Sequence, residues 1–474
     1  MKKKDMKFSK IFNKKDFNVT TKPDKNANQN KEISSFRRYL PQVLACSAKN
    51  LLIVEYGLAV SFTTILISAL TGLNPTLNPN ETLSITPDQS TWIASITMIF
   101  QPIGALLTGF TEPLGRKKAL MFVNILYAVA WIMLYFAQDL IVIYSAFAWL
   151  GIVIGLMESP IFTYIAEISE PRTRGTLMAS ASIAAACGIS AVLFIGNQTS
   201  WRNAALICGG LPIFSIFVLF FVSRKYISEN HLFFVIEKKN QRISQVPETP
   251  LWLLSKNRDT EALKSLQWLR GWVDAASVQN EFNDLQRSKV AAQMCYECEK
   301  QNISCTHPPP TLRQKIRDLF RRRILRPFIL IAFLYFLSAT TGINPYRPYL
   351  VQTLYWFKSP IDPNEVVIWF GHIGILANIL LVFTIRLHGK RLLFLWTMGG
   401  IILVSFALGI YGFMYMPLDL ISFDIANSTH VQMVDKSTDP MRYLPLVAFA
   451  MLIVLGNFGV QSIPNMMLSE VFPF

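Results

Sequence analysis

Oppositely charged residues recur at the ends of apolar stretches in this sequence. Three adjacent cations begin at Arg116, with Glu112 four residues before them, and Glu167 and Arg174 follow a later apolar stretch. Carboxylates and guanidinium groups form charge-assisted hydrogen bonds, so the chemistry indicated is ion pairing that can form and break. The sequence shows no nucleophile beside a base, no phosphate loop and no nucleotide motif. An enzyme is therefore not expected.

A second group of residues has the types that bind metal. Cys295, Cys298, Cys305 and His307 form the pattern C-x2-C-x6-C-x-H, and thiolate and imidazole ligands suit tetrahedral zinc. The last spacing is too tight for a familiar zinc finger. A reduced loop without metal is therefore favoured, and no metal or other cofactor is expected.

The elements that must position these residues are membrane-length helices. Hydrophobic residues make up 52% of the 474-residue chain and charged residues only 16%, whereas a soluble chain carries about 25% charge. Stretches long enough to cross the hydrocarbon as helices lie near 43–69, 91–111, 118–137, 140–163, 176–196, 203–222, 326–345, 364–385, 392–415 and 443–464. The sequence predicts an all-α polytopic membrane protein with ten spans.

The net charge of +15 could suggest nucleic acid binding, but the cations cluster in the N-terminal tail and in alternate loops. Residues 1–40 are predicted to be a disordered basic tail. Because Lys and Arg near span ends mark the cytoplasmic side, the N-terminus is expected to be cytoplasmic. No nucleic acid partner is expected.

The loops expected on the side of the membrane opposite the N-terminus are poor in cations, and one of them, the loop 417–442, is acidic. These loops are predicted to be external, and the three sequons in them are candidate glycosylation sites: Asn80, Asn197 and Asn427. The polar interval 223–325 is predicted to be cytoplasmic. It is amphipathic from Glu261 onward, with apolar residues at helical spacing, and is expected to form short interfacial helices.

Four motifs, in order along the chain, carry a resemblance to a known family. They are Gly104–Lys118, Pro160–Gly175, Pro247–Leu254 and Gln461–Pro473. Together they resemble the major facilitator superfamily and, within it, the sugar porter family. The stretches Thr86–Ile93 and Cys305–Pro310 resemble the insect facilitated trehalose transporter branch.

The resemblance implies a major facilitator fold of two pseudo-symmetric helical bundles with the substrate between them. The expected organisation is the tail 1–40, a six-helix bundle at 41–222, the cytoplasmic loop 223–325 and an incomplete four-helix bundle at 326–474. The implied function is movement of a sugar, trehalose or a hexose, by alternating access and facilitated diffusion. The partners are then a small solute and the lipid bilayer, in the plasma membrane, with no obligate protein partner.

Two alternatives stay open. The chain could carry another small solute, with proton coupling through Glu55, or it could be a non-transporting sensor or truncated product. Glu55 could equally be a structural partner for Lys49 in the first span, where charges need a cavity or a pair. The sequence ends at Phe474, where relatives continue through two more spans, and 223–245 interrupts the usual approach to the third motif. The missing spans would leave the C-terminal half open on one side, and the product as written could then fail to transport.

The resemblance also implies a cytoplasmic gate, whose ion pairs form in the outward-open state and break when the mouth opens. Small residues at Gly104 and Gly109 would let helices approach closely. The residues assigned to the gate are Gly104, Glu112, Gly115, Arg116, Glu167, Arg174, Gly389, Lys390, Arg391 and Glu470. The alternative is that these charges only orient the loops.

For the substrate site, the resemblance implies polar residues near the cavity, because buried hydroxyl groups of a sugar need partners. The usual glutamine pair in the seventh span is replaced by Ser338 and Ala339. The residues assigned to substrate binding are Asn344, Ser182, Ser338, Asn457 and Asn465. For Asn344, a helix–helix hydrogen bond is the alternative role.

Overall fold

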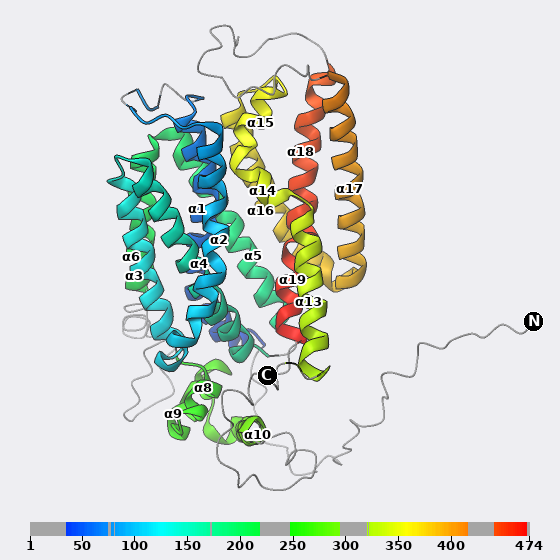
Figure 1. Cartoon of the computed structure of the whole chain (residues 1–474). Coiled ribbons are helices and arrows are strands. Elements are labelled where there is room, and N and C mark those ends of the chain that lie inside the picture. The colour runs from blue at the N-terminus through cyan, green and yellow to red at the C-terminus, as the bar shows by residue number, and fades with distance from the viewer. Residues whose placement is uncertain are drawn as a thin grey trace, which may run out of the picture.

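A computed structural model describes residues 35–73, 77–79, 81–170, 173–218, 247–293, 320, 322–415 and 440–471. Within these ranges all regular secondary structure is helical. Figure 1 shows two helical halves side by side, with three further helices below the N-terminal half.

The N-terminal half contains six long helices that pack on one another. They are α1 (Ser35–Leu70), α2 (Pro87–Thr111), α3 (Arg116–Tyr135), α4 (Leu140–Ile168), α5 (Arg174–Gln198) and α6 (Trp201–Phe217). A short 3-10 turn, η2 (Glu112–Leu114), joins α2 to α3. Helix α2 begins at a capping box, in which Thr86 and Gln89 satisfy each other's backbone amide groups, as expected where four amides lack helical partners.

The C-terminal half is less regular. Its helices are α13 (Arg322–Thr340), α14 (Ile343–Tyr346), α15 (Leu350–Trp356), α16 (Pro363–His388), α17 (Lys390–Tyr415), α18 (Tyr443–Leu455) and α19 (Ser462–Val471). Shorter segments connect them: η5 (Arg347–Tyr349), η7 (Pro440–Arg442) and the π-helical η8 (Gly456–Val460).

Each of the ten predicted spans coincides with a helix, and one of them needs correction. Eight described helices are long and apolar enough to cross a membrane, and α6, with 17 described residues, is shorter. The seventh span was predicted to end at residue 345, but α13 stops at Thr340. The chain turns at Gly342, where φ is +73°, and continues to Trp356 as a segment bent by 40°. A left-handed glycine ends helices in this way.

Glycines set the closest helix contacts in the N-terminal half. A Cβ atom on Gly104 of α2 would lie 2.0 Å from the backbone oxygen of Ile152 in α4, and one on Gly188 of α5 would lie 2.1 Å from that of Val54 in α1. These positions admit only a hydrogen atom, so the close approach predicted for Gly104 is confirmed. The same prediction for Gly109 is wrong, because no described residue lies within 4 Å of its Cβ position.

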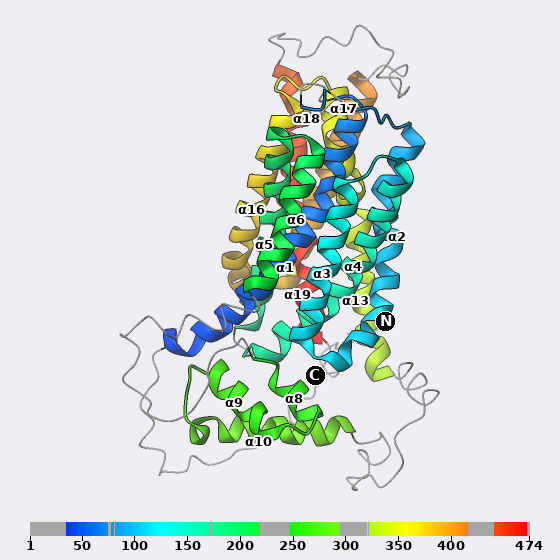
Figure 2. The same ribbon diagram turned by 90° about the vertical axis from the view of Figure 1, so that its left-hand side faces the viewer.

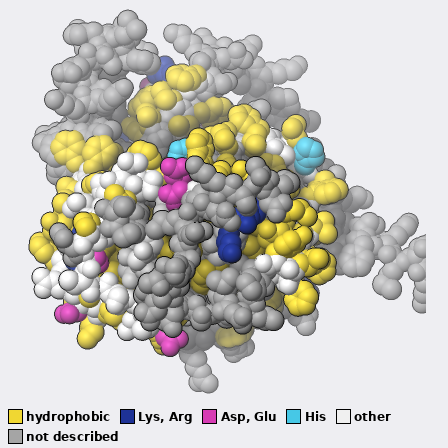
Figure 3. All heavy atoms as spheres, turned by 90° about the horizontal axis from the view of Figure 1, so that it is seen from above, with side chains coloured by type: hydrophobic (Ala, Val, Ile, Leu, Met, Phe, Trp, Pro, Cys, Tyr) yellow, Lys and Arg dark blue, Asp and Glu magenta, His cyan; other side chains and the backbone are white. Residues whose placement is uncertain are grey.

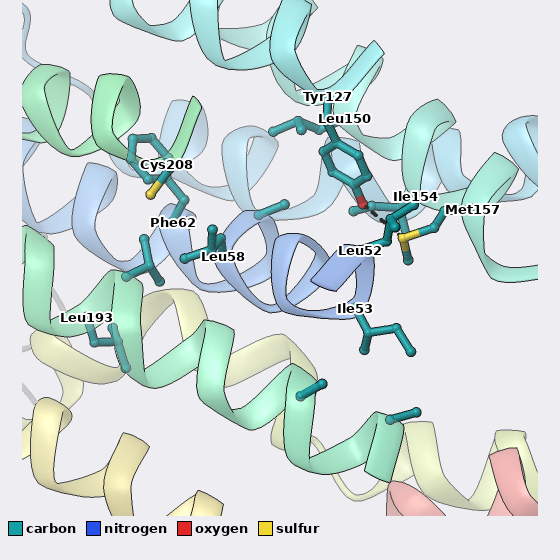
Figure 4. Packing of buried hydrophobic residues seen from close by; sticks show 14 of the residues in the cluster. Leu52, Ile53, Leu58, Phe62, Tyr127, Leu150, Ile154, Met157, Leu193 and Cys208 are labelled. Atoms are coloured by element: carbon teal, nitrogen blue, oxygen red, sulfur yellow. Dashed lines mark hydrogen bonds between the residues drawn. The ribbon is translucent and has the colours of Figure 1, made fainter. Parts of the chain in front are cut away.

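Large side chains fill the interior of this half. Trp131 and Phe62 pack edge to face with ring centroids 5.1 Å apart, a favoured aromatic geometry. In Figure 4 the Tyr127 ring points toward Met157, to whose sulfur its hydroxyl donates a 3.7 Å hydrogen bond. The buried phenol therefore has a partner, and the core needs no water there.

The outward faces of the helices are apolar too. Leu106, Ile141 and Phe413 are 81%, 79% and 92% exposed, and Figure 3, seen from the end opposite α8–α10, shows many hydrophobic and few charged side chains on the described surface. So large an apolar surface would be a liability in water. It is the surface expected of helices that contact lipid.

The two halves meet along a seam between α5 and α16. Gly371 of α16 lies against Ser190 of α5, whose Cα atom is 2.9 Å from the glycine's Cβ position. Beside it, Ser190 Oγ and His372 Nδ1 are 2.8 Å apart. Farther along, Thr64 of α1 donates to the backbone oxygen of Arg347 at 3.1 Å, and Gln352 of α15 donates to Thr71 at 3.4 Å. The halves therefore touch through few polar contacts.

Three short helices cover one end of the N-terminal half (Figure 2). They are α8 (Pro250–Ser255), α9 (Asp259–Leu269) and α10 (Ala275–Gln293). Leu254, Leu266 and Phe282 lie in a small apolar core of their own. The amphipathic stretch from Glu261 is thus a helix, α9, whose apolar face packs on its two neighbours.

Candidate functional site

An ion-pair cluster lies at the end of the N-terminal half that α8–α10 cover. Arg116, the first residue of α3, approaches Glu167 near the end of α4 at 3.2 Å and Glu112 at 3.6 Å. The Arg116 and Glu167 side chains are only 15% and 8% exposed, whereas Glu112 is 63% exposed. The pairs predicted for Arg116 therefore exist, and the one with Glu167 is largely withdrawn from solvent.

The Pro247–Leu254 motif docks on the same turn. Glu248 accepts a 2.8 Å hydrogen bond from the backbone amide of Lys117, and Trp252 donates its indole N–H to the backbone oxygen of Glu112 at 3.3 Å. Gly115 has φ +95°, and its Cβ position lies 3.0 Å from Glu248 Oε1 and 3.1 Å from the Trp252 ring. Glycine is needed here both for its backbone angle and for the docking of these two side chains.

A second cluster ties α9 and α10 to the ends of α1 and α4. Glu170 lies 2.9 Å from Arg38 and 3.6 Å from Arg270, and Arg270 pairs with Glu281 at 2.5 Å. Arg270 also donates to the backbone oxygen of Ile168 at 3.2 Å, at an end of α4 where carbonyl groups lack helical partners. The hydrogen bonds from residues 247–293 to the bundle that the described residues show all reach residues 37–170.

Sequence reasoning missed several members of these clusters. Glu248, Trp252, Glu170 and Arg270 were not assigned, although the first two stand inside a quoted motif. The sequence feature that could have indicated Glu248 and Trp252 is the presence of a carboxylate and an indole beside a helix that begins at a proline. The partner of that motif, the glycine turn at Gly115, was already known from the first motif.

The remaining residues assigned to the gate fall in different places. Gly104 lies within the α2–α4 contact and away from these clusters. Arg174, at the start of α5, is not in an ion pair among the described residues, and its buried Nε atom lacks a hydrogen-bond partner there. Gly389, with φ +75°, separates α16 from α17, which begins at Lys390 and Arg391. The side chain of Glu470 lies outside the described part of the chain. A gate shared by both halves remains a prediction.

A small cavity lies at the seam between the halves, and most of its lining is apolar. It has a volume of about 40 Å³ and is lined by α1 and α5 on one side and by η5, α16 and α18–η8 on the other; its polar lining residues are Ser61, Thr64, Arg347 and Asn457. A water molecule needs roughly 10–15 Å³ on this measure. This cavity therefore has room for water molecules but is too small for a sugar in this conformation.

Of the residues assigned to substrate binding, Asn457 lines this cavity. It lies in the π-helical turn η8 and accepts a 3.3 Å hydrogen bond from Asn378 of α16. π-Helical turns are frequent at functional sites. Ser338 is buried in α13 and Ser182 is half-buried in α5, and neither is in the lining of the cavity.

Asn344 and Asn465 lie on the C-terminal side of the seam. Asn344 is exposed and accepts a 2.9 Å hydrogen bond from Gln461, so the helix–helix role weighed for it is present while the side chain stays accessible. Asn465 accepts a hydrogen bond from the Tyr335 hydroxyl. Both residues can thus reach a solute, and substrate contact for them remains a prediction.

Arg347 is a residue of this site that sequence reasoning missed. It follows the break in the seventh span, lines the cavity and donates to Gln461 Oε1 at 3.0 Å. The prediction had ended that span at residue 345, which left Arg347 in a loop. The signal available was a cation three residues after Asn344 in an otherwise uncharged stretch.

Glu55 lies inside the N-terminal half and is not in the cavity lining. Its carboxylate accepts a 2.6 Å hydrogen bond from Ser215 of α6. Lys49 lies with Nζ 4.5 Å from the centre of the Tyr164 ring, a cation–π contact. Glu55 and Lys49 form no ion pair with each other, so the structural pairing weighed for them is wrong.

The other candidate sites lie mostly outside the described residues. That holds for Asn80 and Asn427, and for Cys295, Cys298, Cys305 and His307. Asn197 is half-buried in the last turn of α5. Within the described ranges no group of three or more His, Cys, Asp or Glu residues could hold a metal ion.

The sequence matches known proteins over most of its length. The model of the Major Facilitator Superfamily matches residues 57–474. The chain is 24% identical to the facilitated trehalose transporter Tret1 of Apis mellifera ligustica, over 92% of this chain and 74% of that protein. It is 25% identical to Tret1 of Drosophila mojavensis, over 91% of this chain but only 43% of that protein.

The fold matches solved structures as well. The proton:xylose symporter XylE bound to 6-bromo-6-deoxy-D-glucose superposes with a TM-score of 0.62 at 16% identity, over 90% of this chain and 82% of XylE. A partially occluded inward-open form of XylE from E. coli gives the same TM-score at 15% identity, over 92% and 85%. At these identities the likeness concerns the fold. With apolar helices of membrane length and a family model that matches most of the sequence, this chain is a multi-pass membrane protein and belongs to the Major Facilitator Superfamily.

Proposed function

We propose that this protein carries a small polar solute, a sugar, across a membrane by alternating access. The observation that carries the proposal is the cavity at the seam, which both helical halves line and which Ser61, Thr64, Arg347 and Asn457 supply with polar groups. In carriers of this architecture, one half rocks against the other around a central site. The cavity is too small for a sugar in this conformation, so solute entry requires the halves to separate.

The comparisons support sugar as the solute. The relatives are named trehalose transporters, and a solved structure with the same fold holds a glucose derivative. The polar groups of the seam add to this, because Asn344, Asn457 and Gln461 present amides that both donate and accept. Trehalose and hexoses are the sugars to test first, and a carrier function makes enzymatic activity unnecessary.

The charge distribution supports an orientation. The ion-pair clusters, α8–α10 and the basic turn at Arg116 all lie at one end of the bundle. By the positive-inside rule we infer that this end is cytoplasmic, together with the basic N-terminal tail, and that the opposite end of the bundle is external. A plasma membrane location follows if the carried sugar is extracellular.

The clusters support a gating role of a particular kind. Arg116, Glu167 and Glu248 join α3, α4 and the segment after α6, all within the N-terminal half. They therefore keep this half and the cytoplasmic helices together as one unit while it moves. A direct gate between the halves would need Lys390, Arg391 and Glu470 to complete it.

Uptake of radiolabelled trehalose and glucose in oocytes tests the proposal. Alternating access is tested by a reducible bifunctional thiol cross-linker across the outer end of the seam, in a Thr71→Cys, Gln352→Cys pair, since the native side chains contact each other at 3.4 Å. Cross-linking is expected to stop uptake, and reductant to restore it. The matched control is an Asn50→Cys, Ser180→Cys pair, whose native side chains are 2.9 Å apart within the N-terminal half; cross-linking it should leave uptake unchanged.

Two results would contradict the proposal. One is absence of uptake of every sugar offered, with the protein present at the surface. The other is uptake that continues at its normal rate when the Thr71–Gln352 positions are fully cross-linked, because the halves could not then be exchanging access.

A further inference from the structure

Two residues of opposite charge, one in each half, form no ion pair with each other. Arg347 lies on η5 in the C-terminal half and lines the seam cavity. Glu158 lies on α4 in the N-terminal half and is half-buried. Among the described residues, neither has an oppositely charged group within 4.0 Å.

Each charge instead has a neutral amide as its partner. Arg347 donates from Nη2 to Gln461 Oε1 at 3.0 Å, and Gln101 of α2 donates to Glu158 Oε1 at 2.8 Å. An amide satisfies one hydrogen bond of the charged group but does not neutralise that group's charge. Arg347 has five N–H groups, so its fork can still bind an acceptor that bears a negative charge.

Tyr56 of α1 shows that the two charges share one region. Its phenol interacts electrostatically with both Glu158 and Arg347. Tyr335 of α13, across the seam, interacts with Glu158 and with Tyr56. Charged and phenolic groups from four elements and both halves therefore interact with one another across the seam.

A charge inside the membrane is costly, and proteins keep such groups for pairing or for solutes. We propose that the carried solute is a sugar bearing a carboxylate, which pairs with Arg347, and that it crosses together with one proton bound by Glu158. This inference rests on the carrier function proposed above and specifies its substrate class.

The proton follows from the sum of charges in the closed site. Without solute, Arg347 and Glu158 sum to zero and the halves can close. With a carboxylate added, the sum is one negative charge, and desolvating an uncompensated charge opposes closure. A proton taken by Glu158 from the entry side restores zero, and it leaves Glu158 again when the carboxylate is released on the other side.

Among the described groups that interact with Glu158, none changes charge near neutral pH. Gln101 donates a hydrogen bond to it, and the phenols Tyr56, Tyr127 and Tyr335 interact with it electrostatically. On α1, Lys49 contacts Tyr164 and Glu55 contacts Ser215. The charged residues of α2, α3, α5 and α19 lie at helix ends, and α8 has none.

The test compares uptake of D-glucuronate and D-glucose, which differ in the carboxylate at one carbon. We expect glucuronate to be preferred, and Arg347→Gln to lower the ratio of glucuronate to glucose uptake about tenfold or more, the factor expected for a lost bond to a charged group. Arg347→Lys keeps a cation and should restore part of the ratio. The control is Arg287→Gln, on the exposed face of α10, which should leave the ratio unchanged.

The second arm measures pH. Glucuronate uptake should rise as external pH falls, because Glu158 must be protonated to admit the acid, and Glu158→Gln should abolish this dependence since glutamine is always neutral. Glucose uptake without glucuronate uptake, an unchanged ratio in Arg347→Gln, or a pH dependence retained in Glu158→Gln would each overturn the inference and leave the carrier function standing.

A binding measurement separates this inference from the carrier function. Glucuronate should raise the thermal unfolding temperature of the purified full chain in detergent, since a ligand that binds only the folded state stabilises it. The effect should be lost in Arg347→Gln. Stabilisation without any uptake would contradict the proposed carrier function and support the site; absence of stabilisation by glucuronate would overturn the site.

Discussion

The ion pair of Arg116 and Glu167 gives the sharpest test of the cytoplasmic cluster. Glu167→Gln keeps the shape and one acceptor of the side chain and removes the charge. Because the two side chains are only 15% and 8% exposed, the loss leaves a desolvated guanidinium. Removing one partner of a buried pair costs about 3–5 kcal/mol, and Glu112, 3.6 Å away but 63% exposed, offsets part of this. We expect the free energy of unfolding to fall by about 2–3 kcal/mol.

A double-mutant cycle isolates the pair. Arg116→Gln, Glu167→Gln and the double variant are unfolded by titration with SDS in mixed micelles, and the coupling energy is taken from the three differences. The matched control is the Arg258–Glu261 pair on α9, whose side chains are 48% and 50% exposed. An exposed pair of this kind contributes about 0.2–1 kcal/mol.

The expected result is a coupling for Arg116 and Glu167 of about 2 kcal/mol, clearly above that of the control pair. Sugar uptake by Glu167→Gln should fall while the protein still reaches the surface. A coupling no larger than the control value, with unchanged uptake kinetics, would refute the reasoning and leave these charges with a role in orientation alone.

Three further predictions follow from the same geometry. Gly115→Ala should lower the free energy of unfolding by about 1–3 kcal/mol, because φ +95° with ψ 158° is a glycine conformation; Gly109→Ala, with no described residue within 4 Å of its Cβ position, is the control and should not destabilise. Burial opposes the ionised form of Glu81 most strongly, but hydrogen bonds from Trp201, Leu83 and Arg202 together outweigh burial and lower the pKa of Glu81. The stability that ionised Glu81 contributes is therefore present at neutral pH and is lost as pH falls through the folded pKa. Acidification should then lower the thermal unfolding temperature more in the native chain than in Glu81→Gln. Glu55→Gln should leave the pH dependence of uptake unchanged, because Glu55 is fully buried inside the N-terminal half and bonds there to Ser215; loss of that dependence would revive Glu55 as the coupling group.

Helical geometry explains which sequence predictions hold. All ten spans are visible in the sequence because each is a long apolar run, and such runs need no tertiary information. The contact at Gly104 was predicted correctly and that at Gly109 was not. Five residues rotate a helix by about 140° relative to the starting position, so both glycines cannot face α4.

The same rotation accounts for the pairing that failed in α1. Lys49 and Glu55 are six residues apart, which places their side chains about 240° apart around the helix. One therefore packs on Tyr164 of α4 and the other on Ser215 of α6. Pairing between them could have been excluded from the sequence, but their true partners could not, because these come from helices more than 100 residues away.

Arg347 shows what sequence patterns cannot supply. The break at Gly342 was not predicted, since a left-handed glycine can end a helix or merely interrupt it. Only the folded chain shows that the segment resumes and places Arg347 at the seam. The proposed substrate site is therefore the part of the molecule least accessible to prediction, because Arg347 lies where the regular pattern of the span is broken.

The distribution of polar contacts argues for two bodies that move as units. The cytoplasmic helices bond to residues 37–170, through Glu248, Arg270 and their partners, so they travel with the N-terminal half. Among the described residues, the hydrogen bonds across the seam are few and include no ion pair, as between Thr64 and the backbone oxygen of Arg347 and between Gln352 and Thr71. Breaking a few such hydrogen bonds costs about 1 kcal/mol each, much less than breaking a buried ion pair. We therefore expect motion to occur at the seam, where a solute that pairs with Arg347 would decide when the halves close.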